Sequence, residues 1–147
     1  MYSSETKIRV RYGETDQMGF LYYGYYALYY ESGRAEAIRQ LGFTYKELED
    51  LGIQMPVVEL NAQYFRPALY DNLITVRTIL KELPTSSKIQ FHSELYNEDG
   101  LFLNRGVTTL VFYDPVEKKK VDMHPELRKR LEPFFTKTAE WATLEQP

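Results

Sequence analysis

The chain has 147 residues, of which 44% are hydrophobic and 27% charged, and its length is enough for one soluble domain to bury a core without metals or disulfides. The absence of Cys excludes disulfides, zinc-thiolate sites and thiol nucleophiles, and a net charge of -3 without a long basic block argues against a nucleic-acid partner. The N-terminal residues lack the pattern of a signal peptide and no segment has the length of a membrane span, so we expect a cytoplasmic protein without a membrane partner.

The first part of the chain predicts a strand, a loop and one long helix. Residues 7–12 alternate polar and apolar side chains, which is typical of a half-buried strand. Its covered face would carry Ile8, Val10 and Tyr12. Two glycines break this period between residues 13 and 21, which indicates a loop. Residues 23–41 contain no Pro and have aromatic and apolar side chains at helical spacing, with Gly42 placed to end the helix. Aromatic residues surround the first half of this helix, so that half should be central in the fold.

The second part predicts strands and a terminal helix. The capping-box pattern of residues 44–47 opens a short helix that ends near Gly52. Runs rich in Val, Ile, Thr, Phe and Tyr then predict strands at 57–65, 73–82, 88–96 and 101–113. Short polar separators make the last three of these strands antiparallel neighbours. Pro125 is placed to begin a helix over residues 126–135, and the tail from 136 to 147 has no clear periodicity.

This order of elements favours an α+β fold. The strands are not interleaved with crossover helices, so a helix packed on an antiparallel sheet is expected, in one domain over residues 1–147 with its core at about 7–133. One central helix fully covers only one face of such a sheet. Apolar residues fall on both faces, with Leu73 and Ile79 against Ile74, Val76 and Leu80. A second chain or the terminal helix should therefore cover part of this apolar surface, and we expect an oligomer.

Three common chemistries find no support in the residue patterns. His92 and His124 are far apart, and neither has a second His or a Cys at ligand spacing, so no metal site is predicted. A serine triad would need one of these histidines and a G-x-S-x-G elbow, which the chain lacks. Neither of the glycine-rich phosphate-binding motifs occurs. We expect neither a metal nor a redox cofactor.

The loop before the long helix contains the remaining candidate. It places a carboxylate, Asp16, just ahead of a helix whose first N–H groups are unsatisfied and whose dipole end is positive. A carboxylate that attacks or activates water beside such an oxyanion site is a hydrolytic arrangement. The alternative interpretation is that Asp16 or Thr15 simply caps the loop, and the pattern alone leaves both open.

This loop and the residues after it resemble a known family. The stretch from Val10 to Glu36, V-R-Y-G-E-T-D-Q-M-G-F-L-Y-Y-G-Y-Y-A-L-Y-Y-E-S-G-R-A-E, resembles the signature of hotdog-fold acyl-CoA thioesterases of the 4-hydroxybenzoyl-CoA thioesterase family. The resemblance extends to Tyr64-Phe65-Arg66-Pro67-Ala68 with Asp71, and to Asp114-Pro115 at the end of the last strand. It implies a five-stranded antiparallel sheet wrapped around one long helix. It also implies edge-to-edge pairing of subunits, in a homodimer or a homotetramer.

The resemblance implies an activity and roles for individual residues. The reaction would be hydrolysis of a small-molecule acyl-CoA to a carboxylic acid and CoA, without a cofactor. Asp16 matches the family's catalytic aspartate, which acts as nucleophile or general base. Tyr23, followed by Gly24, matches the helix start whose backbone N–H polarises the thioester carbonyl. Many members have His at the position of Tyr23 and Asn at that of Tyr25, so any acid–base role of that His is lost here.

Other residues near the loop are candidates for contact with the substrate. These are Gly19, Tyr22, Tyr26 and Lys88. The tyrosines would wall an acyl pocket suited to an aryl or medium chain, and Lys88 would meet a CoA phosphate. The alternatives are core packing for each tyrosine and ordinary solvated charge for the lysine. Glu31 and Arg34, three residues apart on a helix, are predicted to form a structural ion pair without a part in chemistry.

Other functions on the same fold compete with the CoA thioesterase. One is a thioesterase that acts on acyl carrier protein, and another is a non-catalytic module that binds acyl thioesters. The replaced positions 23 and 25 favour the binding module. A hydratase ranks lower, because it would need a His base near the Asp16 loop and neither His of the chain lies close in sequence.

Overall fold

The computed structural model describes residues 1–144, together with the side chains of residues 1–136. In this part of the chain the helical elements are η1 (Tyr12–Glu14), η2 (Tyr23–Tyr25), α1 (Tyr26–Gln40), α2 (Tyr45–Asp50) and α3 (Pro125–Leu144). The strands are β1 (Tyr2–Arg9), β2 (Val57–Tyr64), β3 (Leu73–Leu80), β4 (Lys88–Tyr96), β5 (Phe102–Val111), β6 (Tyr113–Asp114) and β7 (Lys119–Lys120). Over the same residues, no helix is long and apolar enough to cross a membrane.

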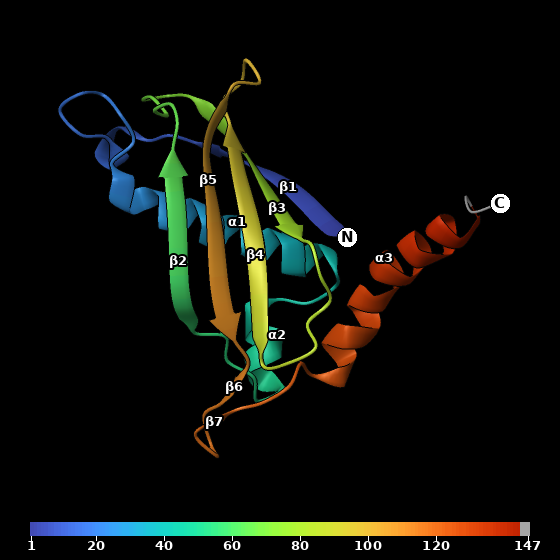
Figure 1. Cartoon of the computed structure of the whole chain (residues 1–147). Coiled ribbons are helices and arrows are strands. Elements are labelled where there is room, and N and C mark those ends of the chain that lie inside the picture. Colours follow the sequence, from blue (N-terminus) through green and yellow to red (C-terminus); the bar gives the residue numbers. More distant parts are fainter. Residues whose placement is uncertain (145–147) are drawn as a thin grey trace.

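Five strands form one sheet in the order β1-β3-β4-β5-β2, in which every neighbouring pair is antiparallel. The long helix α1 crosses one face of this sheet (Figure 1). The β3–β4 and β4–β5 pairs are the predicted hairpin neighbours, whereas β2 pairs with β5 and forms an edge of the sheet. The predicted α+β fold, with an antiparallel sheet on one long helix, is confirmed.

Two helix boundaries follow from signals in the sequence. The Thr44 hydroxyl accepts a hydrogen bond from the Glu47 N–H at 3.1 Å, which is the predicted N-cap of α2. Gly42 follows α1 with a φ of +96°, a conformation that glycine adopts without steric strain. The third helix differs from its prediction, because α3 continues past residue 135 to Leu144. The side chains of the predicted tail from residue 137 on lie outside the described residues.

The first strand lies earlier in the sequence than the predicted residues 7–12. β1 begins at Tyr2, and the chain leaves the sheet after Val10, which is buried as predicted. Tyr12 was expected on the buried face but is 79% exposed in η1. The chain turns here because the Glu14 N–H donates to the Arg11 carbonyl at 3.0 Å, which closes η1 and ends the strand period.

The core lies between α1 and the inner face of the sheet, in two clusters of buried side chains. The cluster at the start of α1 contains Tyr26, Tyr29 and Tyr30, each at most 3% exposed, so the central position predicted for these aromatics is confirmed. The other cluster joins the end of α1 to α2, α3 and strands of the sheet.

On the other face of the sheet, Leu73 is half-buried and Ile79 is buried. Ile79 on this face is only 5% exposed in the single chain, since it lies among Lys81, His92 and Glu94. The helix α3 packs into the inner core instead. Exposed apolar side chains gather along β2 and directly after it, at Val57, Val58, Leu60, Tyr64 and Phe65. A group of exposed apolar side chains therefore lies along this edge of the sheet.

Candidate active site

The loop before η2 forms a small hairpin that leads into the long helix. The Tyr22 N–H donates to the Glu14 carbonyl, and the Asp16 N–H donates to the Phe20 carbonyl, both at 2.9 Å. At the tip, Gly19 adopts a φ of +76° and its N–H donates to the Asp16 carbonyl at 3.0 Å. These hydrogen bonds place Asp16 on one arm of the hairpin, whose other arm leads into the start of η2.

The two carboxylate oxygens of Asp16 have different surroundings. Oδ1 accepts hydrogen bonds from the N–H groups of Met18 at 2.9 Å and Phe20 at 3.2 Å. Oδ2 takes no hydrogen bond or ion pair from any residue in the described part of the chain. One oxygen therefore caps the turn, as the alternative interpretation held, and the other remains available for chemistry.

A cleft of about 310 Å³ opens beside this carboxylate. Its lining residues are Asp16, Met18, Phe20, Leu21, Tyr23, Tyr26, Tyr64, Phe65, Arg66 and Pro67. The rings of Tyr26 and Tyr64 meet edge to face, with centroids 5.0 Å apart at 89°, and the Tyr64 hydroxyl donates to the Tyr23 carbonyl at 3.4 Å. Half of the lining residues are thus aromatic, and one carboxylate and one guanidinium line the same cleft.

Two phenols of this cleft, those of Tyr26 and Tyr64, stay neutral. Burial raises the pKa of the Tyr26 phenol, and the negative charge of Asp16 adds to the rise. Burial also raises the pKa of Tyr64, with a smaller contribution from Tyr23. Neither phenol titrates near neutral pH, so these groups offer hydrogen bonds and apolar surface but no acid–base function there.

The start of η2 supplies N–H groups to this region. Tyr23 and Gly24 are its first residues, and their N–H groups find no hydrogen-bond acceptor within the part of the chain described. η2 runs directly into α1, so the positive end of the helix dipole lies here. A Cβ at Gly24 would come within 2.9 Å of the Tyr22 ring, which packs against the Tyr23 ring with centroids 4.7 Å apart. Glycine is therefore what allows this ring to lie over the helix start.

Most of the predicted site residues come together at this cleft. Asp16, Tyr23 and Tyr26 line it, and Gly24 follows directly after Tyr23. Gly19 lies in the hairpin tip between two lining residues. Tyr22 is 44% exposed and packs on the Tyr23 ring at the outer side of the helix start.

Lys88 lies in a different place. It begins β4 opposite Val111, whereas the cleft residue Tyr64 pairs with Asn104 at the other end of β5. Seven residues of strand separate these two positions, which is roughly 23 Å. Lys88 lines a separate hollow with Lys81 and His92, so one chain does not bring it to the Asp16 cleft.

Seven of the ten cleft residues were not chosen from the sequence as site residues, and four of these seven follow one another in the chain. Residues 64–67 extend from the end of β2 into the wall opposite the hairpin. Their signal was the Y-F-R-P-A segment, which matched the family pattern and was interpreted as a strand-to-turn boundary.

The predicted ion pair between Glu31 and Arg34 is wrong. Arg34 is 5% exposed and donates from Nη1 to the Thr108 hydroxyl at 3.3 Å, whereas Glu31 is exposed. Position 34 falls on the side of α1 that faces the sheet, so the guanidinium turns inward instead of along the helix surface. In the residues that the structure describes, no group of three or more His, Asp or Glu is placed to hold a metal ion.

An antiparallel sheet on one long helix, with a carboxylate hairpin at the start of that helix, is the architecture of hotdog-fold thioesterases. Residues 10–131 match the family model described as the Thioesterase-like superfamily, and the chain belongs to this family. The expected family and fold are thereby confirmed.

Individual relatives agree with this placement. The Bacillus subtilis protein YneP is 32% identical over 136 residues, which cover 88% of this chain and 98% of YneP. The acyl-CoA thioester hydrolase YbgC of Escherichia coli O157:H7 is 27% identical, over 76% of this chain and 83% of YbgC. The crystal structure of a DHNA-CoA thioesterase from Staphylococcus aureus superposes with a TM-score of 0.87 at 30% identity, covering 95% of each chain.

Proposed function

We propose that the protein is an acyl-CoA thioesterase that hydrolyses an acyl-CoA to a carboxylic acid and CoA. The observation that supports this most strongly is that the Asp16 carboxylate and Tyr23, at the start of η2, line one aromatic cleft. The names of the E. coli and S. aureus relatives describe the same reaction class. The aromatic walls suit an aryl or medium acyl chain.

The proposed reaction places the thioester carbonyl in this cleft. Oδ2 of Asp16 either attacks the carbonyl carbon or takes a proton from the attacking water. Negative charge then develops on the carbonyl oxygen, where the Tyr23 N–H and the helix dipole stabilise it. The carbon–sulfur bond breaks, and CoA leaves as a thiolate that takes up a proton. Where Asp16 is the nucleophile, water then hydrolyses the acyl–aspartyl anhydride and restores the carboxylate. Water therefore supplies the new oxygen of the acid in either case. The oxyanion donor is a main-chain group, so it is retained although Tyr replaces the commoner His.

We also propose that the protein is at least a homodimer, joined through β2. This strand is an edge of the sheet, so its outward N–H and C=O groups lack a neighbouring strand. It also carries the exposed apolar side chains of Val57, Val58 and Leu60. Pairing with β2 of a second copy would continue the antiparallel sheet and cover these side chains. Tyr64 lies on the same strand and lines the cleft, so the partner would lie beside the site.

The test is free-thiol release from a panel of acyl-CoAs with short, long and aryl chains, with Asp16→Asn assayed beside the parent protein. Asn retains an oxygen for the two N–H bonds of the turn but lacks a carboxylate. We expect release from at least one panel member and its loss in the variant. Undiminished turnover by Asp16→Asn would contradict the assignment of Asp16. A folded parent protein without release from any acyl-CoA would favour acyl carrier protein as carrier, or the binding module, which thermal stabilisation by ligand without turnover would identify.

A further inference from the structure

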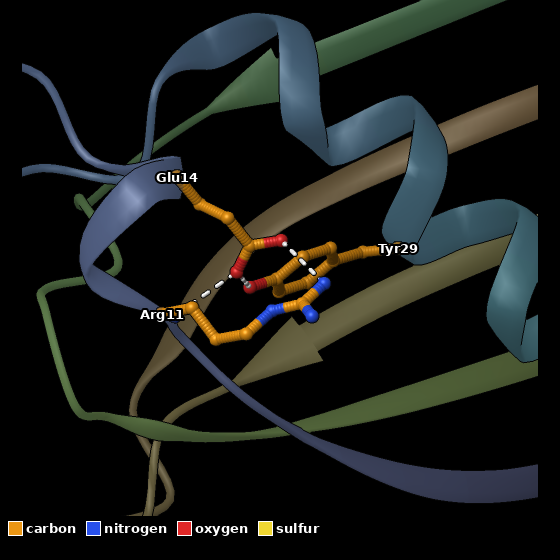
Figure 2. A network of polar contacts seen from close by, with 3 residues as sticks. All are labelled: Arg11, Glu14 and Tyr29. Carbon is orange, nitrogen blue, oxygen red and sulfur yellow. Dashed lines mark hydrogen bonds and ion pairs between the residues drawn. The ribbon is translucent and has the colours of Figure 1, made fainter.

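Glu14 is a buried carboxylate that the proposed chemistry does not use. It is 7% exposed, and its Oε1 accepts hydrogen bonds from the Tyr29 hydroxyl at 2.8 Å and from the Arg11 N–H at 3.0 Å (Figure 2). The Arg11 guanidinium lies 3.5 Å from Oε2 but is itself 80% exposed. Burial and the bond to Glu14 raise the pKa of Tyr29, so its phenol remains a neutral donor.

Burial of the Glu14 carboxylate has a free-energy cost. An ionised side chain loses hydration energy in the core and needs hydrogen bonds to compensate. Among the buried residues of the described chain, Glu14 is the only acidic one. An apolar side chain of similar size would fill the same space without that cost. The carboxylate is thus better explained by what it joins than by stability.

What Glu14 joins are the two parts of the proposed site. Its side chain bonds Tyr29, which lies on α1. Its main-chain carbonyl accepts from the N–H of Tyr22, the residue directly before Tyr23. Asp16 follows two residues later in the same hairpin. One residue therefore connects the hairpin that holds the carboxylate, the first turn of η2 and the body of α1.

We propose that Glu14 is a positioning residue: its bond to Tyr29 sets the distance between the Asp16 carboxylate and the Tyr23 N–H. This inference rests on the proposed function. The bond crosses from hairpin to helix, so its loss would let the hairpin shift while α1 keeps its place in the core. A displacement of about 1 Å between reacting groups is enough to reduce turnover by roughly 100-fold.

The experiment measures kcat and KM for thiol release in variants that lack either the acceptor or the donor of the Glu14–Tyr29 hydrogen bond. Glu14→Ala removes the acceptor and should lower kcat by roughly 10- to 100-fold, with KM within about threefold of the parent value. Glu14→Gln keeps an oxygen acceptor at the same position and should restore most of kcat. Tyr29→Phe removes only the donor hydroxyl and should lower kcat in the same way. Tyr12→Phe is the matched control, because Tyr12 is exposed and lies in the same turn.

Coupling between the variants separates positioning from general stability. Because both changes remove one bond, Glu14→Ala combined with Tyr29→Phe should have a kcat no lower than Glu14→Ala alone. Product CoA should bind all variants equally in calorimetry, and thermal unfolding should show them folded at the assay temperature. If Glu14→Ala does not fold, Tyr29→Phe decides the question, since it keeps the ring.

Outcomes that overturn the inference are distinct from those that overturn the proposed function. Parent-like kcat in folded Glu14→Ala or Tyr29→Phe, with Asp16→Asn inactive, would remove the role of Glu14 and leave the thioesterase proposal intact. Losses that multiply in the double variant would also overturn it, since independent effects do not arise from one bond. Full turnover by Asp16→Asn would instead remove the proposed function on which the inference rests.

Discussion

The proposed function gives Asp16 two separable roles, and a pair of substitutions at this position distinguishes them. Oδ1 holds the hairpin tip through two main-chain N–H groups, while Oδ2 is the oxygen assigned to chemistry. Asp16→Asn keeps an acceptor oxygen for the tip and removes the carboxylate. Asp16→Ala removes both. The two variants should therefore agree in activity and differ in stability.

The size of the stability difference follows from the two bonds. Loss of a side chain that caps main-chain N–H groups costs about 0.5–2 kcal/mol. The tip of the hairpin is exposed and water can replace part of the lost bonding, so Asp16→Ala should fall within this range. For a chain of this length each kcal/mol lowers Tm by roughly 2–4 °C. The free energy of unfolding of Asp16→Asn should lie within about 0.5 kcal/mol of that of the parent protein.

Both variants should lose about 10²- to 10⁴-fold in turnover, the range of a positioned acid–base group. The measurements are thermal and urea unfolding beside the thiol-release assay on the best acyl-CoA. Equal destabilisation by Asn and Ala would show that Oδ1 does not hold the hairpin. A large difference in turnover between them would show that the loss in Ala comes from hairpin movement and not from the carboxylate.

Three further predictions concern packing, pH and assembly. Gly106→Ala should lower the free energy of unfolding by about 1–3 kcal/mol, because the added Cβ would overlap the fully buried Tyr30 ring, whereas Gly13→Ala, where nothing lies within 4 Å, should be near neutral in urea unfolding; equal effects would contradict this. Burial, together with the charge of Lys81, lowers the pKa of His92 below its usual 6.5, so the unfolded state binds more protons and stability should fall as the pH drops below 6.5. His92→Gln should flatten that part of the stability profile, and an unchanged slope would refute the reasoning. Leu60→Lys should shift sedimentation from dimer to monomer with unchanged circular dichroism, and a persisting dimer would place the interface elsewhere.

The fold was predictable where local patterns determine structure. The period of the strands and the separators between them located β3, β4 and β5 to within about two residues, because each hairpin is a local event. The place of β2 was not predictable from these patterns. It pairs directly with β5, although β3 and β4 lie between the two strands in the sequence, and no turn encodes that pairing.

The same distinction holds for the site. Asp16 and Tyr23 lie in one continuous segment, so a family signature could point to both. Tyr64 and Arg66 reach the cleft only because β2 occupies the edge of the sheet with its end beside the hairpin, a long-range arrangement. Glu14 lies inside the stretch that resembles the family signature, but the sequence gives it no role, since an acidic residue in a glycine-bounded loop is typically solvated. Its bond to Tyr29 is seen only in the structure.

The replacement of the commoner His by Tyr at position 23 is compatible with this arrangement. The Tyr23 side chain packs on the Tyr22 ring, and the Tyr23 carbonyl accepts from the Tyr64 hydroxyl, so the residue is held by contacts that leave its N–H without a partner in the described chain. An oxyanion donor needs a fixed direction more than a particular side chain. Hydrogen bonds from Tyr64 at Tyr23 and to Glu14 at Tyr22 hold the backbone on both sides, which would supply that direction to the proposed oxyanion donor. The contacts at the helix start therefore orient the Tyr23 N–H. Substitutions in these contacts should affect turnover more than changes in the phenol of Tyr23 itself.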